Sequence, residues 1–75
     1  MNKELAKLVM GVAKEMQVCK KSEVFKQISK KKNVSKKEFD AVIDELMEEQ
    51  WLVSIYGSDS TFAITQKGLK ELKKI

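Results

Sequence analysis

The chain has 75 residues, a net charge of +4, and a composition of 43% hydrophobic and 35% charged residues, which suits one small folded domain rather than a disordered chain. Its apolar runs are far shorter than the ~20 residues of a membrane-spanning helix, and its N-terminal segment, with Glu4, lacks the apolar core of a secretory signal. We therefore expect a cytoplasmic protein that makes no membrane contact.

Residue types on which many enzymes and metal sites depend are scarce in this sequence. It has no His and one Cys, Cys19, so neither a His-activated nucleophile nor the usual zinc ligand set can form within the chain. Its glycines stand apart and form no phosphate-binding loop. We predict a binding module rather than an enzyme, without metal or cofactor, in which Cys19 is a small buried side chain.

Two amphipathic helices are predicted in the first half of the chain. Apolar residues recur at helical spacing over residues 3–16, directly after Asn2, a favourable N-cap. Residues 18–19 suit a very short strand, and a second helix is expected to begin with Ser22 as its cap and to end at Asn33 in the left-handed conformation. The apolar positions of the two helices are Leu5, Leu8, Val9, Val12, Ala13 and Met16, then Val24, Phe25 and Ile28.

The third helix has the clearest local signal in the sequence. Ser35-Lys36-Lys37-Glu38 matches the capping box, in which Ser and Glu each satisfy a free backbone N–H of the other. The helix is predicted to run to about Gln50. Only four or five residues separate it from the second helix, a spacing typical of a helix-turn-helix. Its apolar positions are Phe39, Val42, Ile43, Leu46 and Met47.

After the third helix the apolar period changes from 3.6 to 2, which indicates strands. Residues 51–56 and 61–65 are predicted to pair as an antiparallel hairpin around a turn at 57–60. Thr65 is then placed to cap a last helix over residues 66–75.

This order of elements resembles the winged helix-turn-helix superfamily of DNA-binding proteins. Residues across nearly the whole chain carry the resemblance, and the stretch from Phe62 to Leu69 looks like the aromatic-x-Ile/Leu-Thr-x-x-Gly pattern that follows the wing in many members. The other residues that carry it are Ser22, Ser35, the stretch Phe39–Leu46, and Trp51-Leu52-Val53.

The resemblance implies an α+β, mostly helical fold, with a three-helix helix-turn-helix core, a β-hairpin wing and a C-terminal helix. It also implies that residues 36–49 enter the major groove of DNA, that the wing at 57–60 touches the neighbouring backbone or minor groove, and that the flanking helices form dimers. The expected single domain, 1–75, divides into a helix-turn-helix at 22–50, a wing hairpin at 51–65 and a C-terminal helix at 66–75.

Charge is strongly segregated along the chain, because residues 20–37 carry a net +7 and residues 38–49 a net −6. The basic block suits either a solvated face or phosphate contacts. Lys at a helix start opposes the helix dipole by up to ~1 kcal/mol, so Lys36 and Lys37 favour phosphate contact. The predicted DNA-binding residues are Lys20, Lys21, Lys30, Lys31, Lys32, Ser35, Lys36, Lys37, Asp40, Tyr56 and Ser58.

Several features leave alternatives open. All basic residues are Lys, so the bidentate Arg–guanine contact is absent, and Asp40 and Asp44 are expected to be exposed and to oppose DNA. Trp51 suits either a core cover or a base-stacking residue. Tyr56 suits either hairpin packing or a sugar or phosphate contact.

Other partners are also compatible with the sequence. The acidic third helix, residues 38–49, could instead dock a protein, and the Lys block could bind RNA. The first and last helices could form a homodimer, which would stabilise so small a domain. The expected seam consists of Leu5, Leu8 and Val12, with Met10 or Met16.

Overall fold

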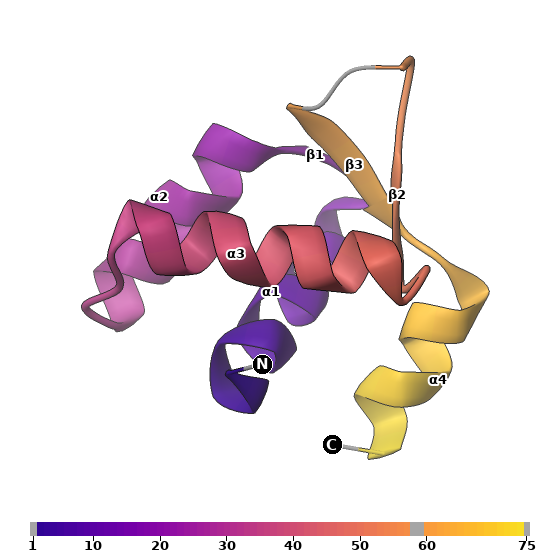
Figure 1. The fold of residues 1–75 in the computed structure, drawn as a ribbon, viewed down its shortest axis with the longest axis horizontal. Coiled ribbons are helices and arrows are strands. Elements are labelled where there is room, and N and C mark those ends of the chain that lie inside the picture. The colour runs from indigo at the N-terminus through magenta and orange to yellow at the C-terminus, as the bar shows by residue number, and fades with distance from the viewer. Residues whose placement is uncertain (1, 58–59, 75) are drawn as a thin grey trace.

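The computed structural model describes residues 2–57 and 60–74 (Figure 1). This part of the chain forms a small α+β domain of four helices and a three-stranded antiparallel sheet. In Figure 1, α3 lies across the front, the β2–β3 hairpin rises from its C-terminal end, and α4 lies below the hairpin. The elements are α1 (Lys3–Met16), β1 (Val18–Lys20), α2 (Lys21–Lys31), α3 (Lys36–Glu48), β2 (Leu52–Ser54), β3 (Thr61–Ile64) and α4 (Gln66–Lys74).

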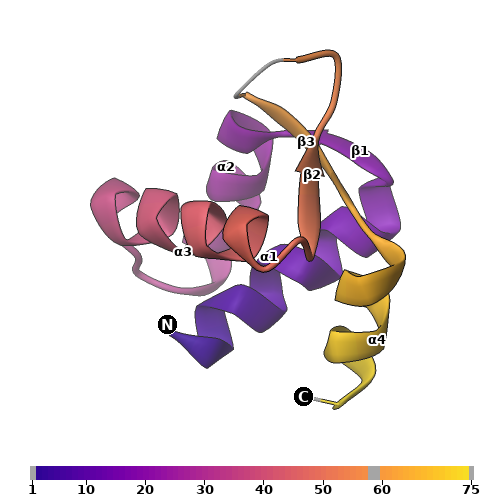
Figure 2. The same ribbon diagram turned by 45° about the vertical axis from the view of Figure 1, so that its right-hand side comes forward.

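Helix α1 is the central element of the core. It contacts α2, α3, α4 and the strands β1 and β3, and in Figure 2 it runs below α3 and then behind the hairpin. The stripe that it buries differs from the expected one: Ala6 and Met10 are buried, whereas Leu8, Val12 and Met16 are only half-buried. The fully buried residues of α1 are Leu5, Ala6, Val9, Met10 and Ala13.

The predicted ends of α2 are wrong by one or two residues. The helix begins at Lys21 rather than after Ser22, and its N-cap, Lys20, makes no side-chain capping hydrogen bond. Strand β1 runs directly into α2, and the N–H of Lys21 donates to the carbonyl of Ser60 on the hairpin at 2.7 Å. The pairing of the strands therefore fixes where α2 starts. Asn33 is not left-handed either, because α2 ends through the extended residue Lys32.

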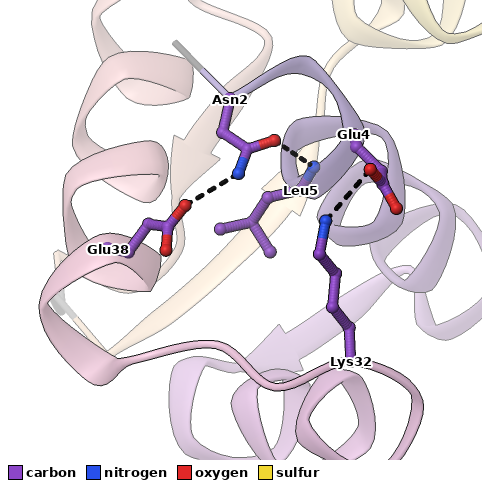
Figure 3. Close-up of polar contacts among 5 residues, drawn as sticks. All are labelled: Asn2, Glu4, Leu5, Lys32 and Glu38. Atoms are coloured by element: carbon purple, nitrogen blue, oxygen red, sulfur yellow. Dashed lines mark hydrogen bonds and ion pairs between the residues drawn. The ribbon is translucent and has the colours of Figure 1, made fainter.

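The predicted N-cap of α3 is confirmed. The hydroxyl of Ser35 accepts a hydrogen bond from the N–H of Glu38 at 3.1 Å. The carboxylate of Glu38, which a full capping box directs back to Ser35, accepts instead from the side-chain amide of Asn2 at 2.7 Å (Figure 3). Asn2 also caps α1 as expected, since its carbonyl oxygen accepts from the N–H of Leu5 at 3.1 Å. One amide side chain thus joins the first turns of α1 and α3.

Helix α3 ends at Glu48, earlier than expected, in a Schellman motif. Gln50 takes the left-handed conformation with φ 65°. Its N–H donates to the carbonyl of Met47, and the N–H of Trp51 donates to the carbonyl of Leu46, both at 3.0 Å. These two bonds satisfy carbonyls that the helix leaves free and turn the chain into β2.

The predicted hairpin is confirmed, and its strands are shorter than expected. The sheet has the order β1-β3-β2, with Cys19 paired to Phe62 and Leu52 paired to Ile64. Cys19 is buried as predicted, at 2% exposure, and its thiol donates to the carbonyl of Phe62 at 3.5 Å. Burial raises the pKa of Cys19 to about 11, with a smaller contribution from the negative charge of Glu23.

The start of α4 is fastened to the end of α3. The hydroxyl of Thr65 accepts from the N–H of Gly68 at 3.0 Å, which confirms the predicted cap, and donates to the carbonyl of Gln50 at 2.6 Å. Trp51 is half-buried against the core, as expected for a cover. A Cβ on Gly68 would lie 2.3 Å from the carbonyl oxygen of Trp51 and 2.8 Å from the side chain of Ile64. Only glycine allows this packing.

Candidate nucleic-acid interface

The basic block of residues 20–37 does not form one surface in the folded protein. Lys32 is half-buried, and its ammonium group lies 3.0 Å from the carboxylate of Glu4 on α1 (Figure 3). Lys31 lines a groove between α1, α2 and α4 with Leu8 and Leu72. Lys31, which is exposed, is the last residue of α2 and Lys32 is its C-cap. These two predicted phosphate-contacting residues therefore lie beside α1.

A second group of predicted residues surrounds a cavity of about 290 Å³ between the start of α2, the first half of α3 and the start of β3. We call it the α2–α3 cavity. Lys21, Ser22 and Phe25 come from α2, Lys36, Phe39 and Asp40 come from α3, and Ser60 precedes β3. The N–H of Lys21 that donates to Ser60 holds the start of α2 against the hairpin.

Asp40 is not exposed as predicted. It is half-buried, and its Oδ1 lies 3.4 Å from the ammonium group of Lys21, which is also half-buried. The contact is an ion pair that falls short of hydrogen-bond geometry, so the buried Oδ1 has no hydrogen-bond partner among the described residues. Each of these two predicted DNA-binding residues reduces the charge that the other presents.

Three lysines of the predicted set remain exposed close to this cavity. Lys36 and Lys37 stand in the first turn of α3, and Lys20 directly precedes α2. Within the described part of the chain none of the three makes an ion pair. The prediction that Lys36 and Lys37 are exposed is thus confirmed. Lys30, near the end of α2, is exposed as well.

The β2–β3 hairpin contributes one exposed aromatic residue. Tyr56 is 90% exposed and left-handed, with φ 60°, next to Gly57 with φ 64°. Hairpin packing is therefore excluded for Tyr56, while a contact to nucleic acid stays a prediction. The predicted contact at Ser58, and the wing-tip Asp59, lie outside the described residues.

The outer side of α3 changes from basic to acidic along the helix. Its exposed residues at spacings of three and four form what we call the α3 ridge. Lys37 begins the ridge, Ala41 follows, and the acids come last. The ridge consists of Lys37, Ala41, Asp44 and Glu48, all exposed. Asp44 is exposed as predicted.

Sequence reasoning missed two residues of the α2–α3 cavity. The sequence places Phe25 only in the core and Ser60 only in the turn, yet both line the cavity. A signal for Phe25 exists, since it lies at the edge of the apolar stripe of α2 and is only half-buried. Nothing local marks Ser60, because its position depends on the pairing of β3 with β1.

No family model, curated protein or solved structure matches this chain. In the described residues no helix has the length and apolar character to cross a bilayer. The fold and the surface thus define a small α+β domain whose third helix begins with exposed lysines and continues with exposed acids.

Proposed function

We propose that this chain is a winged-helix protein that binds duplex DNA, contacting the phosphate backbone with lysines at the start of α3. The observation that carries the proposal is the exposure of Lys36 and Lys37 without an ion pair in the described part of the chain. Positive charge is unfavourable at a helix N-terminus. A dense array of phosphates, one charge per ~1.7 Å of duplex, would compensate it.

The surroundings of α3 support this mode of binding. Lys20 is exposed at the start of α2, and the bond between Lys21 and Ser60 brings that start next to the hairpin. The starts of α2 and α3 and the turn of the wing at Ser60 therefore lie around one cavity. This arrangement is compatible with the helix-turn-helix and wing that the sequence resembles.

The same surface favours binding without sequence reading. Lys contacts a phosphate as a point charge and lacks the planar fork that reads guanine. Further along the α3 ridge, Asp44 and Glu48 are exposed and would repel phosphates if the helix entered the groove deeply. We propose a transcription regulator or accessory factor that grips the backbone near the start of α3.

The test is a titration of duplex DNA at several salt concentrations. Replacing Lys36 and Lys37 together by Ala is expected to weaken binding similarly for every sequence and to reduce the salt slope by roughly two units, since each phosphate contact contributes about 0.9. The matched control replaces Lys70 and Lys73, exposed on α4, and removes the same charge. An equal loss of DNA affinity in the control would show that the net charge of the protein, rather than the lysines at the start of α3, causes the binding.

The acids give a second, independent readout of the same titration. Asp44→Asn is expected to strengthen non-specific binding, because a repulsive charge leaves the α3 ridge. Asp40→Asn should strengthen it too, because Lys21 then loses its 3.4 Å ion pair and presents its full charge. Unchanged affinity in both variants would place the DNA elsewhere on the protein.

A protein partner is the second candidate function, and the acidic part of the α3 ridge favours it. Ala41, Asp44 and Glu48 leave a small, accessible and negatively charged strip that suits a basic partner. If the chain binds no duplex even at low salt, and Asp44→Lys abolishes binding to a partner, docking through α3 replaces DNA binding.

A further inference from the structure

The α2–α3 cavity has an aromatic floor that the fold does not fully cover. The rings of Phe25 and Phe39 meet edge to face, with centroids 5.1 Å apart and planes at 61°. Phe39 is 1% exposed and belongs to the core, whereas Phe25 is half-buried. The ring of Phe25 thus packs on a buried ring, is itself only half-buried, and lines the cavity.

The rim of the cavity is polar and carries both signs of charge. Ser22 and Lys36 line the cavity and are exposed, and Asp40 lines it as well. Oδ1 of Asp40 is buried against Lys21. Because the side chain as a whole is 39% exposed, Asp40 stays accessible to a ligand.

An apolar floor, an acceptor in the wall and a cation at the rim match three parts of one ligand. A flat aromatic ring would lie on Phe25, an amino group on that ring would donate to Asp40, and a phosphate would pair with Lys36. Adenine, cytosine and guanine nucleotides have all three parts, since each of these bases carries an exocyclic amino group, whereas thymine has none. Base–aromatic stacking is the usual way in which proteins hold unstacked bases.

We propose that the α2–α3 cavity binds one unstacked base that carries an exocyclic amino group, with the base on Phe25, its amino group on Asp40 and its phosphate on Lys36. The proposal rests on the nucleic-acid binding proposed above and adds a contact to a base. A base inside an intact duplex is stacked and cannot enter, so the ligand is a single strand or a base extruded from a duplex.

The experiment compares four DNA probes with wild-type protein: single-stranded dA and dC 12-mers, a dT 12-mer, and a fully paired duplex of random sequence. Wild type is expected to bind dA and dC several-fold more tightly than dT. Phe25→Leu, which keeps an apolar side chain and removes the aromatic face, should weaken dA and dC binding about tenfold and leave duplex binding unchanged. A duplex with one extruded adenine, added as a fifth probe, separates the two sources of the base.

Ile28→Val is the matched control, because it trims a buried residue of the same helix that does not line this cavity. It should leave the affinity for the single strands unchanged. Asp40→Asn should reduce the preference for dA and dC over dT, since the amide replaces the charged acceptor. Equal losses in Phe25→Leu and Ile28→Val would mean that loosening of α2, rather than a missing base contact, lowers the affinity, and would overturn the proposal.

The failure of this proposal and the failure of duplex binding give different results. If wild type binds duplex and Phe25→Leu binds single strands like wild type, the base site is wrong while the proposed function stands. If wild type binds dA through Phe25 but no duplex, the base site stands and the proposed function is wrong. If Phe25→Leu does not fold, the base site is tested in the wild-type protein by nuclear Overhauser contacts between the ring protons of Phe25 and the base protons of a bound dA 12-mer. The absence of these contacts at saturation would overturn the base site.

Discussion

The hydroxyl of Thr65 joins the two ends of the hairpin, because it donates to the carbonyl of Gln50 at 2.6 Å and also accepts from the first turn of α4. Gln50 is the left-handed residue that ends α3. A backbone hydrogen bond joins the same two segments, because the N–H of Thr65 donates to the carbonyl of Trp51, the residue after Gln50, at 3.0 Å. One threonine therefore fixes where the hairpin closes and where α4 begins.

Thr65→Val is expected to lower the free energy of unfolding by about 1–2 kcal/mol. The substitution keeps the shape and removes the hydroxyl, so the N–H of Gly68 loses its cap, a change of the size measured for N-caps, and the carbonyl of Gln50 loses its donor. Chemical denaturation measures the difference. Thr65→Ser keeps the hydroxyl, so its free energy of unfolding should fall far less. An equal fall in both variants would contradict the role of the hydroxyl.

Gly68→Ala is expected to destabilise the fold by about 1–3 kcal/mol, the range for an overpacked site. The new Cβ would stand 2.3 Å from the backbone oxygen of Trp51, and the backbone cannot move aside as a flexible side chain can. Gly11→Ala is the control, because a Cβ there meets nothing within 4 Å. In a helix interior, Ala is more favourable than Gly by up to about 1 kcal/mol. Thermal unfolding should therefore shift in opposite directions for the two variants.

The thiol of Cys19 gives a pH-dependent prediction. Burial raises its pKa from 9.0 to about 11, so the folded state binds the thiol proton more tightly than the unfolded state does. The stability from the neutral thiol is complete below pH 9 and is lost as the pH rises from 9 to about 11. Denaturation experiments at pH 8 and pH 10.5 should show that the free energy of unfolding falls more in wild type than in Cys19→Ala. An equal fall in both proteins would contradict the raised pKa.

Self-association through α1 and α4 stays a prediction, with a revised set of residues. Leu5 and Met10 are 0% exposed and cannot form a seam. Leu8, Val12 and Leu72 are half-buried and line the groove of about 290 Å³ between α1, α2 and α4. We expect a homodimer in sedimentation at micromolar concentration and a shift toward monomer in Leu8→Ser. A wild-type species of 8.6 kDa alone would exclude the dimer.

Much of the fold could be predicted because its signals are local. The caps at Asn2, Ser35 and Thr65 are side chains that bond to N–H groups three residues ahead, so a short stretch of sequence is enough to reveal them. The change of period after α3 marks the hairpin for the same reason. The start of α2 was missed because its backbone bond goes to Ser60, far along the chain.

The sequence by itself determined the order of the elements, most of the core and the division of charge into a basic and an acidic block, since these depend on residue type and spacing. Only the tertiary structure decided which charges act together. Lys21 and Lys32 belong to the basic block, yet each pairs with an acid from another helix, Asp40 and Glu4. The side of a helix on which a lysine lies is set by the packing of that helix on its neighbours. The net charge of a segment therefore does not predict the surface that it forms.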